Sequence, residues 1–144
     1  MLVLRCSFLV VGLGACVSST ESFHRVTIDG TVTALDEDPS PVWLEVHHAW
    51  VGDGALRYPM GFIAERAQDA PGSFTWTLDV PMDEGGEGLV LYGWQDRDGD
   101  GVLCGLGGSV EPSGVEEAGA WPVYALTMDL VLEHDCAGPE ALYP

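Results

Sequence analysis

Positive charge is almost missing from this sequence. The 144 residues include no lysine and five arginines, against 23 acidic residues, for a formal net charge of −18 at pH 7. A surface of one negative sign repels the phosphates of nucleic acids and of anionic lipid headgroups. We therefore expect no nucleic-acid partner, and divalent cations are the natural counterions. Simple solubility is the alternative role for this charge.

Catalytic motifs are also missing. The sequence contains no Gly-x-Ser-x-Gly, no His-Glu-x-x-His and no phosphate-binding loop. The glycine-rich segment 105–109 follows an acidic segment, which would repel phosphate. With 23 acidic residues, chance carboxylate pairs are expected, and nothing places two of them in an apolar cleft. The sequence therefore predicts a protein that is not an enzyme.

Helical periodicity and internal repeats are absent, whereas alternation typical of strands is frequent. A hydrophobic fraction of 47% and five tryptophans favour a folded domain over a disordered chain. Alternating or continuous apolar residues predict strands at 26–34, 42–50, 58–65, 73–80, 89–94 and 123–132. Residues 95–120 are expected to form loops. Short strands with turn-rich connections predict an all-β fold, an antiparallel β-sandwich of about seven strands that is Ig-like or prealbumin-like.

The N-terminus has the layout of an export signal. Arg5 precedes an apolar run, which ends in small residues at Gly14 and Ala15. The segment Leu13-Gly14-Ala15-Cys16 resembles the lipobox of bacterial lipoproteins. This resemblance implies a signal peptide over 1–15, lipid on Cys16 and a tether over 16–23. Val17 after the cysteine favours the outer membrane of the cell envelope over the inner membrane. Plain secretion and a buried N-terminal strand are the alternatives.

The remaining cysteines predict a disulfide. Cys6 leaves with the signal peptide and lipid takes Cys16, so that Cys104 and Cys136 remain. A pair of cysteines in an exported protein is typical of a disulfide. Two free, partly buried thiols are the alternative.

The most informative segment is Asp-Arg-Asp-Gly-Asp-Gly at 96–101. Asp96, Asp98 and Asp100 followed by Gly101 match the first half of a calcium loop, because Ca²⁺ prefers six to eight oxygen ligands. Gly101 permits the left-handed backbone that such a loop requires. The carbonyl oxygen of Val102 is the next predicted ligand. An exposed acidic turn is the alternative.

The pattern departs from an EF-hand after this point. The twelfth position is Gly107, which has no side chain, so a further carboxylate must come from elsewhere. We expect it to be Glu111, with Glu116 or Glu117 as alternatives. The segment then resembles the Asp-x-Asp-x-Asp-Gly loops of exported β-domains. The bound calcium is expected to be structural, bracing the same region as the disulfide.

Histidines and tryptophans give weaker signals. His47 and His48 are adjacent in a predicted strand, so their side chains leave on opposite faces. His24 and His134 can meet only if the first and last strands pair. Trp76 is expected in the core, Trp94 in the core or beside the calcium loop, and Trp43 on the outward face as the candidate for a glycan contact.

The order of the motifs resembles a known domain type. A Gly-x-Val strand, a Phe-x-Trp-x-Leu-x-Val-Pro strand, a Leu-Tyr-Gly-Trp strand and an Asp-rich loop follow one another. This order is similar to that of prealbumin-like, carboxypeptidase-regulatory-type sandwiches, and it implies a fold but no activity. We expect a β-sandwich domain over 24–136 and a tail over 137–144. The predicted role is a non-catalytic, lipid-anchored accessory or binding module with a protein or glycan partner. A calcium-dependent adhesion or glycan-binding domain is the alternative.

Overall fold

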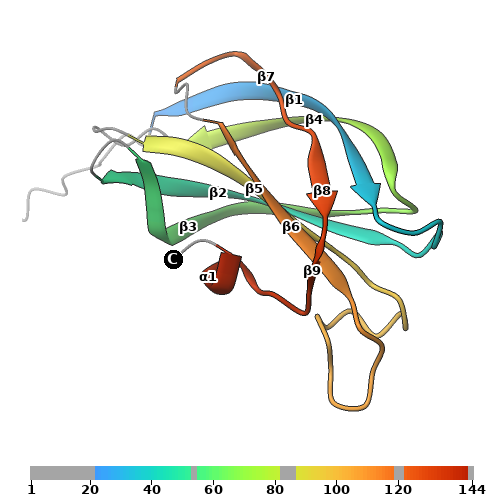
Figure 1. The fold of residues 1–144 in the computed structure, drawn as a ribbon. Coiled ribbons are helices and arrows are strands. Elements are labelled where there is room, and N and C mark those ends of the chain that lie inside the picture. Colours follow the sequence, from blue (N-terminus) through green and yellow to red (C-terminus); the bar gives the residue numbers. More distant parts are fainter. Residues whose placement is uncertain (1–21, 53–54, 82–86, 119–121, 143–144) are drawn as a thin grey trace, which may run out of the picture.

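The protein is described by a computed structural model over residues 22–52, 55–81, 87–118 and 122–142 (Figure 1). The predicted signal peptide and the lipidation at Cys16 lie outside these residues. The strands are β1 Phe23–Ala34, β2 Val42–Gly52, β3 Ala55–Gln68, β4 Gly72–Pro81, β5 Glu87–Gln95, β6 Pro112–Ala118, β7 Ala125–Thr127, β8 Leu130–Leu132 and β9 His134–Asp135, and a short helix α1 spans Pro139–Leu142. No helix in the described part of the chain is long and apolar enough to cross a membrane.

Two sheets pack face to face, which confirms the predicted all-β sandwich. One sheet has the order β3-β2-β5-β6-β9, and all of its pairs are antiparallel. In the other sheet β1 is central, with β4 antiparallel on one edge. The opposite edge of β1 pairs with β7 and then with β8, both in parallel. The parallel pairs were not expected.

Alternation along the strands explains how the core forms. In β1 and β4, every second side chain points inward and those between them face solvent. The main core consists of Val26, Ile28, Val32, Val42, Leu44, Val46, Phe74, Leu78, Val80, Leu89, Leu91, Ala118, Met128, Leu130 and Leu132. Trp76 is partly buried and packs against this cluster, in agreement with its expected place in the core.

Strand β6 lies in the segment that was expected to form loops. Its sequence, Pro-Ser-Gly-Val-Glu-Glu-Ala, lacks the alternation of apolar residues. Gly114 in this strand permits close packing, because a Cβ atom there would lie 2.0 Å from the carbonyl oxygen of Val131. The glycine that weakens the strand pattern in the sequence therefore serves the contact between the two sheets.

The last predicted strand, 123–132, is broken into β7 and β8. Between them the chain crosses Gly30 of β1, where a Cβ atom would lie 1.9 Å from the carbonyl oxygen of Met128. The N–H of Met128 donates to the carbonyl oxygen of Asp29 at 3.0 Å, and Asp129 accepts from the N–H of Thr31 at 2.9 Å. The break lets one segment pair with β1 at two places.

Strand β3 is longer than the predicted 58–65. It is an edge strand, and its pairing with β2 shifts register twice, between Val46 and His47 and between Ala49 and Trp50. Proline is tolerated at an edge or a bulge, because its missing N–H is then not needed for the ladder. Pro59 lies at the second of these shifts, where it falls outside the paired residues.

Candidate metal centre

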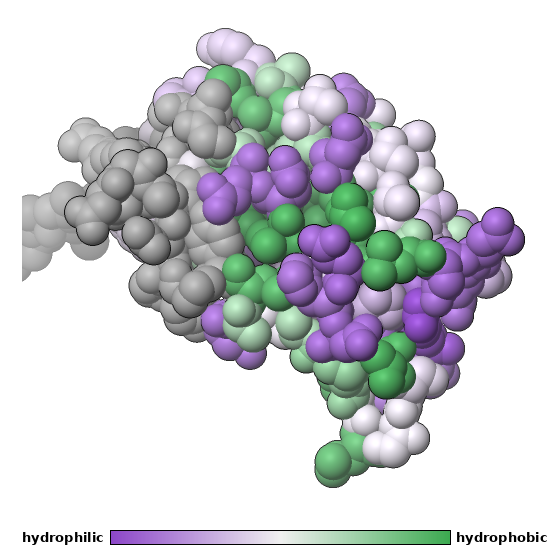
Figure 2. Space-filling model, viewed as in Figure 1, coloured by the Kyte–Doolittle hydropathy of each residue, from purple (hydrophilic) through white to green (hydrophobic). Residues whose placement is uncertain are grey.

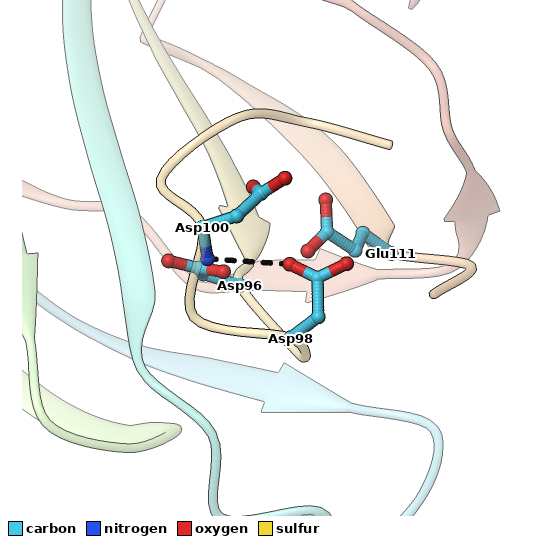
Figure 3. Close-up of side chains that lie close together, drawn as sticks. All are labelled: Asp96, Asp98, Asp100 and Glu111. Atoms are coloured by element: carbon cyan, nitrogen blue, oxygen red, sulfur yellow. Dashed lines mark hydrogen bonds between the residues drawn. The ribbon is translucent and has the colours of Figure 1, made fainter. Parts of the chain in front are cut away.

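Four carboxyl groups gather where the chain leaves β5 and enters β6. Each of Asp96, Asp98, Asp100 and Glu111 offers an oxygen atom, and these atoms all lie within 4.8 Å of one another. Asp96 and Glu111 are buried, whereas Asp98 and Asp100 are exposed. Figure 3 shows the carboxyl groups of Asp98, Asp100 and Glu111 turned toward a common space, with Asp96 beside them. The structure therefore brings together the three predicted aspartates and the first-choice glutamate.

The backbone of the loop curls around its own carboxylates. Gly99 and Gly101 have φ angles of 74° and 72°, which confirms the left-handed conformation predicted at Gly101. Asp96 accepts hydrogen bonds from the N–H groups of both glycines, at 2.8 and 3.1 Å. Asp98 accepts from the N–H of Asp100 at 3.2 Å, and Asp100 from that of Val102 at 2.7 Å. These local bonds hold the aspartates on the inside of the turn.

Glu111, directly before β6, binds the start and the middle of the loop. Its side chain is fully buried. One carboxylate oxygen accepts from the N–H of Arg97 at 3.0 Å, and the other accepts from the N–H of Cys104. Glu116 and Glu117, the alternatives for the fourth ligand, lie further along β6 and are not part of the cluster.

The glycine-rich segment that follows the aspartates packs directly against them. A Cβ atom at Gly105 would lie 2.7 Å from an oxygen of Asp100, and one at Gly108 would lie 2.3 Å from an oxygen of Asp98. The N–H of Ser109 donates to that same Asp98 oxygen at 2.9 Å. The segment thus packs against the carboxyl groups of Asp98 and Asp100. The glycines are visible in the sequence, but their contact with the aspartates depends on how the loop folds back.

A disulfide holds the loop to the end of the last strand. Cys104 and Cys136 are bonded, with Cα atoms 5.5 Å apart, which confirms the predicted bridge. Cys136 directly follows β9, and its N–H donates to the carbonyl oxygen of Glu111 at 2.9 Å. The bridge and the Glu111 contacts therefore fasten the same loop at neighbouring points.

No arginine or histidine of the described residues forms an ion pair with the four carboxylates. Arg97 belongs to the same segment, but its side chain is directed elsewhere. It forms an ion pair with Asp36 at 2.6 Å and approaches Asp38 at 3.8 Å. Within the described part of the chain, the negative charge of the cluster is thus not balanced by a side chain.

The donor set fits a hard cation. Two oxygens on opposite sides of one Ca²⁺ ion lie about 4.8 Å apart, because each Ca–O distance is roughly 2.4 Å. The spread of the four side-chain oxygens matches this limit. Each carboxylate oxygen has two lone pairs, so the oxygens of Asp96 and Glu111 keep acceptor capacity beyond their backbone bonds. The carbonyl oxygen of Val102 remains a predicted ligand.

The four histidines do not share a site. His47 contacts Glu45 at 2.9 Å, whereas His48 contacts the carbonyl oxygen of Pro81 at 2.8 Å. His24 lies in β1 and His134 in β9, and these strands belong to different sheets.

The tryptophan expected on the outward face, Trp43, is half-buried. It stacks on Trp94, with ring centroids 6.3 Å apart and ring planes 14° from parallel. The two rings border a groove that also reaches Gly101 of the acidic loop. Of the two expected places for Trp94, the structure gives the one beside this loop: Trp94 is 6% exposed but lies outside the main core cluster, on the face of the sheet that carries Trp43.

Comparison of the sequence with known protein families and with curated proteins finds no match. The two-sheet fold is shown, but the prealbumin-like family is not identified. The acidic cluster, the disulfide and the tryptophan groove are therefore the features from which a function can be inferred.

Proposed function

We propose that this protein is a non-catalytic β-sandwich module of the cell envelope, with a structural calcium site in the 96–111 loop. Its role is that of an accessory or binding module. The observation that carries the proposal is the convergence of Asp96, Asp98, Asp100 and Glu111 within 4.8 Å. Like charges at such spacing repel one another, and a divalent cation turns this repulsion into attraction.

Calcium suits this loop better than magnesium. Mg²⁺ requires near-ideal octahedral geometry and keeps several of its waters, whereas Ca²⁺ accepts irregular sets of six to eight oxygens. Two of the four carboxylates are exposed, so waters can complete the coordination shell. The site lies beside a disulfide that braces the same loop, which favours a structural role for the ion.

Export and anchoring are part of the proposal. The disulfide supports a location outside the cytoplasm, where such bonds persist. The lipid anchor at Cys16 rests on the lipobox alone. Globomycin treatment should block cleavage and leave a larger precursor in the membrane fraction, whereas Cys16→Ala should prevent formation of the lipidated mature form. Unchanged size and unchanged membrane association would contradict the anchor.

Isothermal titration with Ca²⁺ tests the metal site. Wild type should bind in the range of roughly 10⁻⁴–10⁻³ M that is typical of extracellular modules. Asp98→Asn should weaken binding strongly, because it removes one negative charge from the site. The loop should keep its conformation, because the amide oxygen can still accept the hydrogen bond from the N–H of Asp100. Asp69→Asn, an exposed aspartate outside the loop, is the matched control. No binding by wild type at millimolar calcium would refute the site.

A further inference from the structure

A groove of about 230 Å³ lies on the outer face of the five-stranded sheet. It is lined by Trp43 and Glu45 of β2, Glu65 of β3, Trp94 at the end of β5, and Gly101. The first four residues come from three adjacent strands, so the sheet holds them in place. This groove is separate from the four carboxylates, and Gly101 is its one residue from the acidic loop.

The aromatic wall of the groove is preorganised. Trp43 and Trp94 are direct partners in the β2–β5 register, and their rings stack nearly parallel. Trp94 is only 6% exposed, which fixes the position of the pair, while Trp43 keeps part of its surface accessible. The face of an indole ring carries negative electrostatic potential and attracts a cation that has lost some of its water.

Two carboxylates stand beside this wall. Glu45 and Glu65 are direct partners in the β2–β3 register, and like charges in this position destabilise a sheet. Glu45 has a hydrogen bond to His47 at 2.9 Å. Glu65 is exposed, and no ion pair to it occurs among the described residues.

The neighbouring arginine does not neutralise the carboxylate pair. Arg66 donates to the carbonyl oxygen of Thr75 at 3.0 Å, and its guanidinium group lies 6.0 Å from the ring of Phe74 and 5.5 Å from that of Trp76. All three contacts are to strand β4 of the other sheet. The groove thus combines aromatic surface with two carboxylates, of which Glu45 contacts His47 and Glu65 has no ion pair among the described residues.

We propose that this groove binds a small organic cation that carries alkyl groups on its charged nitrogen, such as a quaternary ammonium compound. The alkyl groups would pack on the exposed part of Trp43, and the positive charge would offset Glu45 and Glu65. A neutral sugar would leave the charge of Glu65 without a partner, and a bare metal ion would make no use of the indole rings. The inference does not depend on calcium in the 96–111 loop.

Choline is a suitable probe, because 3,3-dimethylbutan-1-ol has the same shape without the charge. Titrations of the full chain by calorimetry, and by NMR of the Trp43 and Trp94 indole N–H signals, should show binding of choline. The neutral alcohol should bind about tenfold more weakly or not at all. Each titration is run once in EDTA and once in calcium, so failure of the calcium site and failure of the groove give different results.

Substitutions locate the binding site. Trp43→Ala should weaken choline binding by about tenfold, and Glu65→Gln by a few-fold with a smaller loss at high salt. The controls are Trp50→Ala, which removes an exposed tryptophan of β2 outside the groove, and Glu37→Gln, which removes an exposed charge elsewhere. Both controls should bind choline like wild type. Because Glu65 is exposed, Glu65→Gln remains informative even if Trp43→Ala fails to fold.

Results of three kinds would overturn the proposal. The first is equal binding of choline and the neutral alcohol, which would indicate a purely apolar groove. The second is choline binding that neither Trp43→Ala nor Glu65→Gln changes, or no choline binding by wild type. The third is binding of a neutral oligosaccharide that Trp43→Ala abolishes while choline does not bind, which would assign the groove to glycans.

Discussion

At the scale of single residues, Glu111 has the most demanding position. It is a fully buried carboxylate directly before β6, and its two oxygens accept from the backbone N–H groups of Arg97 and Cys104. A buried donor without an acceptor costs free energy, because it has lost water and gained nothing in return. Glu111 thus has a structural role even before any metal is considered.

We expect Glu111→Ala to lower the free energy of unfolding by about 2–4 kcal/mol, since two backbone donors lose their acceptors. The loss should persist in EDTA, because it does not depend on a bound ion. Urea unfolding followed by tryptophan fluorescence measures it. Glu117→Ala, at an exposed position of the following strand β6, should change stability by no more than about 0.5 kcal/mol. Equal effects of the two substitutions would contradict this role for Glu111.

A second residue, Glu116, predicts a pH dependence. Its pKa is raised, first by partial burial and then by the negative charges of Asp129 and Glu117. Between the unfolded pKa of about 4.3 and the raised folded value, the folded protein binds more protons than the unfolded chain. The free energy of unfolding contributed by Glu116 therefore falls as pH rises through this window.

Glu116→Gln should consequently be more stable than wild type at pH 7, and the difference should vanish below about pH 4, where Glu116 is protonated in both states. Melting temperatures of both proteins across this pH range test the prediction. If wild type is as stable as Glu116→Gln at pH 7, or more stable, then the ionised form of Glu116 does not destabilise the folded state.

At the scale of elements, the 96–111 loop is held at several points. Asx-type bonds curl its first half, glycines pack against the aspartates in its second half, and the disulfide fastens its middle to the end of β9. In Figure 1 the segment between β5 and β6 extends beyond the end of the sandwich. Figure 2 shows hydrophobic surface at the far end of this extension. Leu106 in this loop is fully exposed. The loop buries little apolar surface, so its conformation depends on these hydrogen bonds and on the disulfide.

Gly108→Ala should weaken calcium binding with little loss of stability. The added Cβ atom would meet the exposed carboxylate of Asp98, which can move aside but then leaves the cluster. We expect an affinity loss of about tenfold, since one charged ligand is misplaced. Calorimetric titration with Ca²⁺ measures it. Leu106→Ala changes an exposed side chain of the same loop and should retain wild-type affinity; an equal loss there would point to the loop as a whole.

At the scale of the whole molecule, charge is the dominant feature. A net charge of −18 on 144 residues destabilises the compact state through self-repulsion. Among the described residues, the arginine ion pairs are those of Arg25, which is exposed, and of Arg97, which is partly buried but pairs with the exposed Asp36. Such pairs contribute little to stability, so they offset little of this repulsion. Cation binding is therefore expected to matter for the stability of the entire domain.

Calcium should raise the melting temperature of the wild-type protein in a concentration-dependent way. Binding to the folded state alone stabilises it by about 1.4 kcal/mol when free calcium is tenfold above Kd. Sodium chloride at equal ionic strength controls for general screening and should raise the temperature less. Asp98→Asn should remove the difference between the two salts. If that difference persists in Asp98→Asn, the stabilising calcium binds elsewhere.

Features that depend on neighbouring residues could be predicted from the sequence. The alternation in β1 and β4 indicated which side chains face the core, because the two faces of a strand repeat every second residue. The left-handed turn at Gly101 followed from glycine after closely spaced aspartates. The pairing of Cys104 with Cys136 followed from counting the cysteines that remain after export and lipidation.

Features that depend on contacts between distant segments were decided only by the tertiary structure. Strand β6 lacks an apolar pattern in its sequence. Its Gly114 is explained by a tertiary contact, because only a residue without a side chain fits where Val131 crosses the strand. The break between β7 and β8 arises where the chain passes over Gly30. The pairing of Trp43 with Trp94 and of Glu45 with Glu65 required the strand register. Local patterns specify conformation, but register and packing arise only when the sheets assemble, because each contact joins residues far apart in the chain.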